Sequence, residues 1–369
     1  MMNLNGLRVA LVGPLPPPEG GMANQTRQLG ELLAKEGAQV TLVRVNAPYR
    51  PRWIGRLRGV RAFFRLVPYV FDLWRAAGRV DLFHVMANSG WSWHLFAAPA
   101  VWVARLRGVP CVVNYRGGEA DSFLDRSASS VLRTLRKASA LAVPSGYLQQ
   151  VFARHGLHSE IVANIVDVER FRPGGKLPPY PHIVVARGLE SIYDIGTALR
   201  AFALLHDRLP AARMSVAGSG PEERALRSLA FQLAISEAVQ FCGRLDRDDV
   251  ATLYRSAWVA LNPSRVDNMP NSVLEAMASG TPVVSTNVGG VPFIIRDGLN
   301  GLLVPPGDYA AMGEALQRVV CDPQLADSLR SAALTDVGQY TWSRVRQQWA
   351  DVYGSAASSS RTEAAWRIL

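Results

Sequence analysis

Short apolar runs alternate with stretches of helical periodicity along almost all of the 369 residues. This alternation predicts parallel sheets whose strands are joined by crossover helices. In the first half we expect strands at Leu7–Gly13, Ala38–Val45, Val80–Met86, Val109–Asn114, Ala140–Val143 and Glu160–Ala163. In the second half we expect them at His182–Ala186, Arg213–Ala217, Ala238–Phe241, Trp258–Asn262, Pro282–Thr286 and Gly301–Val304. The expected helices include Met22–Lys35, Ser127–Lys137, Gly196–Leu209, Glu222–Gln232, Asp248–Ser256, Pro270–Ser279 and Ala310–Val320.

The strand and helix pattern pauses at Arg172–Pro181, where six of ten residues are Gly or Pro, as in a linker. We therefore predict an α/β fold of two doubly wound, Rossmann-like domains facing each other across a cleft. The N-terminal domain covers 1–170, the linker 171–181 and the C-terminal domain 182–340. Residues 341–369 should form a helix that packs back toward the N-terminal domain and a loose tail, including the serine-rich Ser355–Ser360.

Apolar residues make up 49% and charged residues 19% of the chain, which is typical of globular proteins. Cys111, Cys242 and Cys321 are scattered without metal-site spacing, which indicates a reducing compartment and no disulfide framework. The first apolar run is too short for a signal peptide, and Leu95–Ala104 is half a membrane span. A cytoplasmic protein is expected.

The net charge of +10 lies entirely in the first 170 residues, where 21 Lys and Arg face 11 Asp and Glu. The other 199 residues carry 19 of each. An anionic partner should therefore be attracted by the first half.

The segment Asn262–Gly280 carries the strongest chemical signal. A buried strand ends near Asn262, and Pro270 opens a helix at a position that proline favours. Free backbone N–H groups of Asn271 to Val273 would offer an anion a seat at the helix start. Glu275 could then accept hydrogen bonds from a ribose diol, and Asp267 from sugar hydroxyls. The alternative is an acidic cap and a solvent-facing glutamate.

This segment, with Thr281–Gly290 and Gly298–Asp308, resembles the family-4 (group 1) glycosyltransferases, which have two Rossmann-like domains in the GT-B architecture. The family carries two acidic residues in this segment. By the resemblance Glu275 matches the second, and Asp267 stands where the first is usually glutamate. Arg187 matches the arginine that binds the donor diphosphate. The lysine usual a few residues later is missing from Leu189–Asp194, so the Tyr193 region or an arginine of the first half would have to replace it. A surface arginine is the alternative for Arg187.

The same resemblance implies a set of donor-binding residues in four loops. They are Gly20, Gly21, Gly218, Gly220, Gly243, Arg244, Asn268, Met269, Pro270, Asn271 and Ser272. Plain turns are the alternative for the glycines. Ala217–Pro221 is not the GxGxxG fingerprint, which argues against a dehydrogenase.

In the N-terminal half, Arg116 stands roughly where the family often has a histidine that contacts the transferred sugar. Its role cannot be carried over from a histidine, although Arg116 should face the ligand. His84, at a strand end, is more typical of a core histidine.

The segment Arg50–Arg79 holds eight arginines and one acid, Asp72. Its apolar residues recur at helical spacing, with Pro68 as a kink: Trp53, Leu57, Val60, Phe64, Val67, Phe71 and Trp74. Such a basic amphipathic helix suits an anionic membrane surface, and a crossover helix packed on the sheet is the alternative. No nucleic-acid-binding module is recognisable.

The resemblance implies a retaining glycosyltransferase that moves a sugar from a nucleotide diphosphate to a glycan or lipid-linked acceptor held by the N-terminal domain, as in bacterial cell-surface polysaccharide or glycolipid synthesis. Neither a cofactor nor a metal is expected, and Asp246-Arg-Asp248 is interpreted as a helix cap. The rival hypotheses are a nucleotide-sugar epimerase of similar build and a donor-binding homologue with weak or no catalysis.

Overall fold

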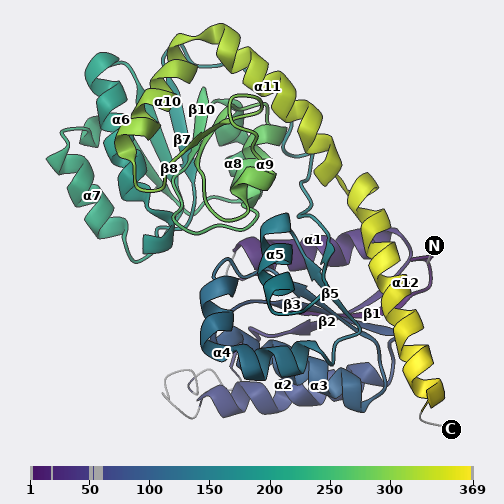
Figure 1. Ribbon diagram of the computed structural model, residues 1–369. Helices are drawn as coiled ribbons and strands as arrows, with labels where there is room; N and C mark the ends of the chain where they lie inside the picture. Colours follow the sequence, from purple (N-terminus) through teal and green to yellow (C-terminus); the bar gives the residue numbers. More distant parts are fainter. Residues whose placement is uncertain (1–2, 18–19, 50–52, 54–60, 367–369) are drawn as a thin grey trace. The chain divides into compact units, whose positions relative to one another are not determined.

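The computed structural model describes residues 3–17, 20–49, 53 and 61–366 (Figure 1). The chain forms two compact units, one built from residues 1–163 and 345–369 and the other from residues 164–344. The division falls after Ala163 rather than at residue 170, and the Val166 N–H donates to the Tyr340 carbonyl inside the second unit. Residues 171–181 contain no helix or strand, and Phe171 among them is buried against Tyr254.

The N-terminal unit is built on a parallel six-stranded sheet with the order β2-β1-β3-β4-β5-β6. Its strands are β1 (Arg8–Gly13), β2 (Gln39–Arg44), β3 (Leu82–Ala87), β4 (Cys111–Tyr115), β5 (Ala140–Val143) and β6 (Glu160–Ile161). Each lies where the sequence predicts a strand. The central strands β1, β3, β4 and β5 are buried on both faces and therefore mostly apolar, whereas the edge strands β2 and β6 are largely exposed. The strand order reverses between β1 and β3.

Helices cover both faces of this sheet. They are α1 (Gly21–Lys35), α2 (Arg61–Ala77), the π-helical turn η2 (Trp93–Ala97), α3 (Ala98–Leu106), α4 (Ala120–Leu135) and α5 (Gly146–Arg154). Figure 1 shows α2 and α3 on one face and α1 on the other. Pro68 lies inside α2 without ending it. Helix α4 consists of two helical stretches merged across a kink at Ser127 (φ −135°), the residue at which the sequence predicts a helix start, and the stretch from Ala120 up to the kink was not predicted.

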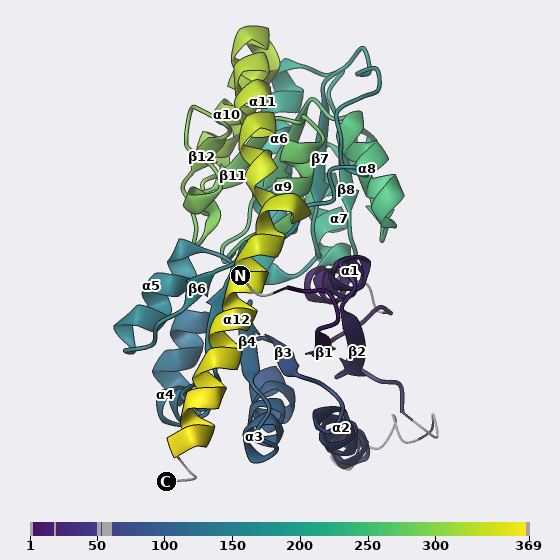
Figure 2. The ribbon, with the colours of Figure 1, turned by 90° about the vertical axis from the view of Figure 1, so that its right-hand side faces the viewer.

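Helix α12 (Trp342–Trp366) runs along the N-terminal sheet, and its residues from Val345 onward belong to that unit (Figure 2). Trp349 and Tyr353 of α12 are fully buried and stack on each other, and both pack against His84 of β3. Helix α12 continues through Ser355–Ser360, the stretch whose composition predicts a loose tail. Its buried side, which includes Ala356, keeps that part of the chain helical.

The C-terminal unit has a second parallel six-stranded sheet, with the order β12-β11-β10-β7-β8-β9. Its strands are β7 (His182–Ala186), β8 (Arg213–Ala217), β9 (Val239–Gly243), β10 (Val259–Asn262), β11 (Val283–Thr286) and β12 (Leu302–Val304). This is the strand order of a dinucleotide-binding Rossmann sheet, and it reverses between β7 and β10. The prediction of two doubly wound, Rossmann-like domains is confirmed.

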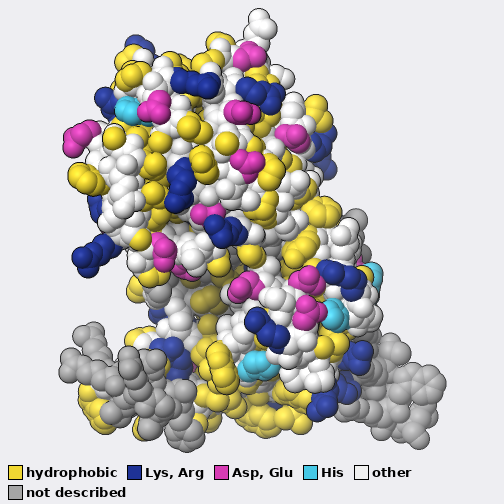
Figure 3. Space-filling model, turned by 60° about the vertical axis from the view of Figure 1, so that its left-hand side comes forward, with side chains coloured by type: hydrophobic (Ala, Val, Ile, Leu, Met, Phe, Trp, Pro, Cys, Tyr) yellow, Lys and Arg dark blue, Asp and Glu magenta, His cyan; other side chains and the backbone are white. Residues whose placement is uncertain are grey.

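The helices of this unit again lie on both faces of the sheet. They are α6 (Ile195–Arg208), α7 (Glu223–Gln232), α8 (Arg247–Arg255), α9 (Asn271–Ala278), α10 (Tyr309–Cys321) and α11 (Pro323–Val337), with short 3₁₀ turns η3 (Ser191–Tyr193), η4 (Ser236–Ala238), η5 (Val291–Phe293) and η6 (Gly338–Tyr340). Figure 1 shows α6 and α10 on one face and α8 and α9 on the other. On the face seen in Figure 3, acidic and basic side chains are interspersed over this unit, and residues 171–369 carry equal numbers of the two kinds.

No helix within the described ranges is both long and apolar enough to cross a membrane.

Candidate functional site

The site begins at the point where the strand order of the C-terminal sheet reverses. In doubly wound sheets, ligands bind outside the carboxyl ends of the strands at this point. Arg187 comes directly after β7, and the loop 263–270 follows β10 and leads into α9. The two strands are hydrogen-bonded neighbours, so Arg187 and this loop meet although they are far apart in the sequence.

Arg187 is held by three side chains of the β10–α9 region. Its Nη2 donates to Asp267 Oδ2 at 2.6 Å and to Ser264 Oγ at 3.1 Å, and its Nη1 donates to Ser272 Oγ at 3.2 Å. The side chains of Arg187 and Asp267 are each only 11% exposed. An ion pair in such a sheltered place is geometrically defined, and the surface-arginine alternative does not hold.

Tyr193 supports the same guanidinium from one face. Its ring centroid lies 4.1 Å from the Arg187 Cζ atom, a cation–π contact. Burial raises the pKa of the Tyr193 phenol, and the charge of Arg187 lowers it again in part. The segment that lacks the family's lysine thus supplies a ring that orients the arginine instead of a second cation. The Arg187 Nε is buried and has no hydrogen-bond acceptor among the described residues.

The loop between Asp267 and α9 is fixed by backbone and side-chain contacts. Asp267 Oδ1 accepts from the Asn268 N–H at 3.0 Å, and the Asp267 carbonyl accepts from the Gly290 N–H at 3.1 Å. Asn164 Nδ2 donates to the Met269 carbonyl and to Asn271 Oδ1, both at 2.8 Å. These bonds hold the loop that precedes the helix in one conformation.

Helix α9 starts as predicted, with Pro270 at its N-cap and Asn271 as its first residue. One expectation about its free donors was wrong. The Val273 N–H donates to the Pro270 carbonyl at 3.2 Å, because the first turn is tightened to an i to i+3 bond. The Ser272 hydroxyl, in the first turn of α9, accepts a hydrogen bond from Arg187. The N-terminus of α9 and the guanidinium group therefore lie next to each other.

Glu275 lies in the middle of α9 and is half-buried, in contrast to the solvent-facing alternative. Loss of hydration raises the pKa of its carboxyl to about 7, although the positive charges of Arg247, Arg187 and Arg170 oppose this rise. Glu275 in turn helps to raise the pKa of the buried Tyr254 phenol, after the larger effect of burial. A carboxyl with this pKa changes charge near neutral pH.

The glycine turn between β8 and α7 has a structural reason of its own. A Cβ on Gly218 would lie 1.8 Å from the Arg187 carbonyl oxygen, and one on Gly220 would lie 2.2 Å from the Leu189 carbonyl oxygen. Gly218 also has a φ of +154°. Both glycines therefore let this turn pack directly on the segment that carries Arg187, whether or not a ligand is bound.

Two further expected donor-binding residues lie beside this turn. The Gly218 N–H donates to the Gly243 carbonyl at 2.8 Å, and Arg244 Nη2 donates to Ser219 Oγ at 3.2 Å. Gly243 has a φ of +66°, a left-handed conformation that favours glycine. The C-terminal unit thus brings the expected residues of β7, β8, β9 and α9 to one edge of its sheet.

The expected residues of the N-terminal half, Gly20, Gly21 and Arg116, belong to the other unit. Gly20 precedes α1 with an extended backbone, and a Cβ there would meet nothing within 4 Å. The neighbouring loop residues 18–19 lie outside the described part of the chain. No packing reason for a glycine at position 20 is evident from these contacts.

Arg116 follows β4 and ends a chain of buried polar side chains. Its Nε donates to Asn114 Oδ1 at 3.1 Å, and its Nη1 donates to Gln25 Oε1 of α1 at 3.3 Å. Burial lowers the pKa of its guanidinium to about 10, so Arg116 stays charged at neutral pH.

His84 is the core histidine that its pattern suggests, and it links Asn114 to α12. Its Nε2 lies 3.0 Å from Asn114 Nδ2, and its Nδ1 lies 2.8 Å from the Tyr353 hydroxyl. Because the amide nitrogen can only donate, Nε2 accepts and the imidazole is neutral. Burial, and after it the nearby Arg116 charge, lower the His84 pKa to about 3. No pattern in the sequence indicates that Tyr353 is its partner.

Asp246 caps α8, as expected for the Asp246-Arg-Asp248 sequence. Its Oδ1 accepts from the N–H groups of Asp248 and Asp249, both at 2.9 Å. Across the residues that the structure describes, no group of three or more His, Cys, Asp or Glu side chains could hold a metal ion.

Comparisons with known proteins agree with this architecture. The family model described as Glycosyltransferase Family 4 matches residues 19–170, and the model described as Glycosyl transferases group 1 matches residues 181–322. Anabaena HepE, solved in complex with UDP-glucose, has a TM-score of 0.73 at 16% identity, over 95% of this chain and all of that one. At this identity the likeness shows the fold.

Curated relatives carry glycosyltransferase names. The D-inositol 3-phosphate glycosyltransferase of Saccharomonospora viridis is 33% identical over 214 residues, which are 53% of this chain and 50% of the relative. The chain thus spans about half the length of this and similar relatives. The phosphatidyl-myo-inositol mannosyltransferase of Mycobacterium leprae is 27% identical over 96% of this chain and 98% of its own length. With a family match in each unit and both sheets in place, the chain belongs to the family-4 (group 1) glycosyltransferases.

Proposed function

We propose that the protein is a retaining glycosyltransferase that moves a sugar from a nucleotide diphosphate donor to a glycan or lipid-linked acceptor. The donor binds to the C-terminal unit and the acceptor to the N-terminal unit. The observation that carries this proposal is the cluster of Arg187, Asp267 and Ser272 at the strand reversal of the C-terminal sheet.

The donor diphosphate is the ligand that this cluster suits best. Arg187 offers a buried Nε–H without an acceptor in the described residues, and the start of α9 adds the positive end of a helix dipole. Ser264, Ser272 and the Tyr193 ring hold the guanidinium in place before the ligand arrives, so little ordering is needed on binding.

In the reaction, the bond between the anomeric carbon and the diphosphate oxygen breaks. The acceptor oxygen forms its new bond on the same face of the sugar, and the acceptor proton passes to the leaving phosphate oxygen. Arg187 stabilises the negative charge that develops on that phosphate. Because the leaving group takes the proton, no side chain has to act as a strong base.

Glu275 and Asp267 are proposed to hold the two sugars of the donor. Glu275, as a carboxylate, accepts from the ribose diol. Asp267 already accepts from Arg187 and Asn268, and its remaining lone pairs are left for hydroxyls of the transferred sugar. Asp267 therefore acts mainly by aligning Arg187, and its reach to the sugar is shorter than that of a glutamate.

The protein is proposed to work at the inner surface of the cytoplasmic membrane, in the synthesis of a bacterial cell-surface polysaccharide or glycolipid. Helix α2 packs on the core through Tyr69 and Leu73, while its opposite side is apolar and exposed. The exposed fractions are 46% for Phe64, 50% for Val67, 57% for Phe71 and 45% for Trp74.

We therefore propose one role for each side of this helix, packing on the sheet for the side of Tyr69 and Leu73 and contact with a membrane surface for the opposite side. The arginines Arg75 and Arg79 are exposed on the same segment and suit anionic lipid headgroups. Arg50, Leu57 and Val60 of the expected amphipathic stretch lie outside the described residues. The relatives named above include one whose name gives a phosphatidylinositol acceptor, which supports a lipid-linked substrate.

No metal or other cofactor is assigned a role. Arg187 and the start of α9 supply the positive charge that a metal ion would otherwise provide at the diphosphate. The Asp246 carboxylate accepts two backbone hydrogen bonds as the cap of α8, which makes it a poor candidate for a metal ligand.

The test is a thermal-shift screen of nucleotide sugars followed by a transfer assay, because a bound donor raises the melting temperature by mass action. We expect one donor class to stabilise the protein and to give a product with the anomeric configuration of the donor. An inverted product would refute retention. A new epimer formed from the donor alone would favour an epimerase, and donor binding without turnover on any acceptor would favour a non-catalytic homologue.

A further inference from the structure

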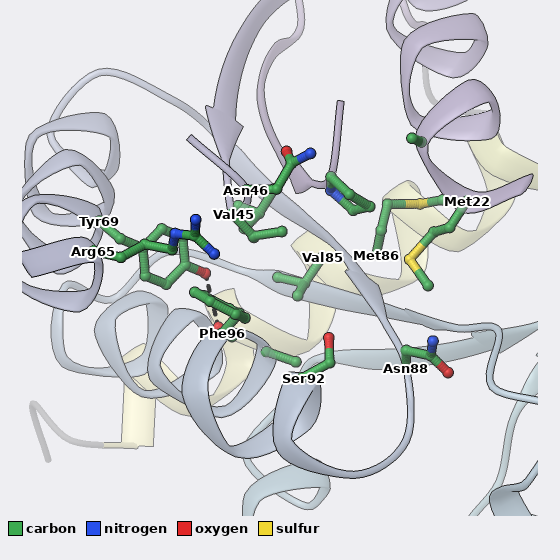
Figure 4. A pocket seen from close by; sticks show the side chains of 14 residues that line it. Met22, Val45, Asn46, Arg65, Tyr69, Val85, Met86, Asn88, Ser92 and Phe96 are labelled. Carbon is green, nitrogen blue, oxygen red and sulfur yellow. Dashed lines mark hydrogen bonds between the residues drawn. The ribbon is translucent and has the colours of Figure 1, made fainter. Parts of the chain in front are cut away.

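The N-terminal unit contains a cavity of about 580 Å³ that lies entirely within that unit (Figure 4). It opens at the carboxyl ends of β1 and β3, where the strand order of the N-terminal sheet reverses. Pro14 follows β1 and Asn88 follows β3, and both line the cavity. In doubly wound sheets this is the position at which a ligand binds.

Most of the wall is apolar. Figure 4 shows Met22 and Met86 at one end, contributed by α1 and β3, and Val45, Tyr69 and Phe96 toward the other. The Tyr69 hydroxyl donates to the Phe96 carbonyl at 2.7 Å, so the tyrosine presents its ring and not its polar end to a ligand. A ligand whose surface consists mainly of hydroxyl groups, such as a sugar, would lose its hydrogen bonds to water here and find few hydrogen-bond partners in the wall.

The polar groups of the wall are mostly engaged with the protein. Asn46 fixes the loop after β1, since its Oδ1 accepts from the Leu15 N–H at 2.9 Å and its Nδ2 donates to the Leu15 carbonyl at 2.8 Å. Asn88 Oδ1 accepts from the Ser89 N–H at 2.8 Å. Asn46 therefore shapes the cavity and has little capacity left for a ligand, and Asn88 keeps only its Nδ2 as a donor.

Arg65 of α2 is the exception. Among the described residues that line the cavity it is the single charged one, and none of these residues is acidic. Its buried Nε has no hydrogen-bond acceptor within the described ranges. The ring of Tyr49 lies 4.1 Å from its Cζ atom and fixes the plane of the guanidinium. A fixed cation with unused donors calls for an anion.

We propose that this cavity binds an amphiphilic acceptor, namely a phosphate ester of an apolar alcohol that also carries the hydroxyl to be glycosylated, with its phosphate on Arg65 and its apolar part against Tyr69, Val45 and Phe96. This inference rests on the proposed function, because it names the acceptor class of the transferase. The exposed apolar side of α2 lies on the same helix as Arg65, so a lipid-linked acceptor could be taken up from the surface that α2 contacts.

The experiment is calorimetric titration of the full chain with four probes. Geranyl phosphate has both an apolar chain and a phosphate, geraniol lacks the phosphate, and inorganic phosphate and glycerol 3-phosphate lack the chain. We expect geranyl phosphate to bind at least tenfold more tightly than each of the other three. Equal binding of glycerol 3-phosphate would mean a water-soluble phosphate ligand and would overturn the amphiphile.

Two variants locate the site. Arg65→Leu should weaken geranyl phosphate at least tenfold and leave geraniol unchanged, and Val45→Asp should abolish geranyl phosphate binding by placing a carboxylate beside the anion. Arg133→Leu removes an equal charge from an exposed position of α4 and should leave the affinity for geranyl phosphate unchanged. Unaltered affinity in Arg65→Leu would overturn the proposal. All three should keep the donor-induced thermal shift, which reports the C-terminal unit.

Failure of this inference is separable from failure of the proposed function. If sugar transfer occurs but geranyl phosphate does not bind, the acceptor class is wrong and the transferase stands. If geranyl phosphate binds through Arg65 and no nucleotide sugar binds, the cavity stands as an amphiphile site and the transferase is wrong.

Discussion

Arg187 and Asp267 form a sheltered ion pair, with Nη2 and Oδ2 2.6 Å apart, although 80 positions separate them in the sequence. β7 and β10 are hydrogen-bonded neighbours, and their carboxyl ends bring the two residues together. The pair explains how an acid can lie beside a proposed diphosphate site. Asp267 neutralises part of the guanidinium charge and fixes its direction, while the buried Arg187 Nε has no hydrogen-bond acceptor among the described residues.

The first prediction concerns this pair. Arg187→Met should lower the free energy of unfolding by about 3 kcal/mol, because it leaves a sheltered carboxylate without its cation. The double variant Arg187→Met with Asp267→Asn should be no less stable than the single one, since no unpaired charge remains. Urea denaturation of these two variants and of the single variant Asp267→Asn measures the coupling free energy. Additive losses would mean that the two side chains act independently.

Catalysis should not recover in the double variant as stability does. Both variants lose the cation at the leaving group, so kcat/KM should fall about 10²- to 10³-fold in each. Arg227→Met is a suitable control, because Arg227 is an exposed arginine of α7 that pairs with Glu223. Activity that recovers with stability in the double variant would show that Arg187 is structural.

The second prediction uses the pKa of Glu275, which burial raises to about 7 from a usual 4.5. Only the carboxylate can accept from both ribose hydroxyls. Donor affinity should therefore weaken as the pH falls from 8 to 6, and Glu275→Gln should bind weakly with a flat pH profile. Titration with an intact nucleotide sugar, whose diphosphate does not change charge in this range, isolates the effect.

The same shift has a consequence for stability, with the opposite sign from that of an ordinary ion-paired acid. Between pH 4.5 and 7 the folded protein keeps a proton that the unfolded chain has released, so stability falls as the pH rises through this window. Glu275→Gln removes this loss. Its melting temperature at pH 8 should exceed that of the wild type by about 2–4 °C, the equivalent of about 1 kcal/mol. A lower melting temperature at pH 8 would contradict the raised pKa.

The third prediction concerns His84, whose buried imidazole has its pKa lowered to about 3. Between about pH 6.5 and 3 the unfolded chain binds a proton that the folded protein excludes, so stability falls as the pH drops through this range. Tyr353→Phe should cost about 1–3 kcal/mol at pH 7, because it leaves the imidazole Nδ1 without its partner.

Asn114 connects His84 to Arg116 by hydrogen bonds. We therefore expect the Tyr353→Phe substitution to alter the orientation of Arg116 as well. A purely structural role predicts that Tyr353→Phe alters stability alone. We expect in addition a rise in KM for the acceptor with kcat less affected, since Arg116 belongs to the unit proposed to bind the acceptor. Unchanged KM would restrict the chain of polar residues to packing.

The fourth prediction concerns the exposed side of α2. Phe71→Ser should weaken binding to vesicles that contain anionic lipid by about tenfold, because burial of one phenylalanine contributes about 1.5–3 kcal/mol. Phe231→Ser is a matched control on α7 of the other unit, where Phe231 is 78% exposed. Cosedimentation with vesicles measures both. Equal losses, or no binding by the wild type, would contradict a membrane role for α2.

Much of the fold could be predicted because it depends on local pattern. β7, β8 and β5 lie at the residues that their apolar runs indicate, and Pro270 marks the start of α9. Ser355–Ser360 shows where composition misleads. Serine is only a moderate helix former, but the burial of Tyr353 and Ala356 decides the outcome, and burial depends on parts of the chain distant in sequence.

The site divides in the same way. The types and order of Arg187, Asp267 and Glu275 are visible in the sequence, whereas their contacts are not. Asp267 was expected to serve sugar hydroxyls, and only the structure reveals that Arg187 takes one of its oxygens. The partner of His84 lies 269 positions away, and no periodicity could point to it. The sequence does not distinguish Arg65 from the other seven arginines of Arg50–Arg79, and only the structure shows that it lines the cavity.

The central claim is that a nucleotide sugar's diphosphate lies at the start of α9. A crystal structure with the donor that gives the largest thermal shift tests it most directly. We expect phosphate oxygens within hydrogen-bond distance of Arg187 Nε and the Ser272 backbone, with the ribose hydroxyls on Glu275. A nucleotide bound elsewhere, with the Arg187–Asp267 pair untouched and Glu275 facing no ligand, would contradict the account.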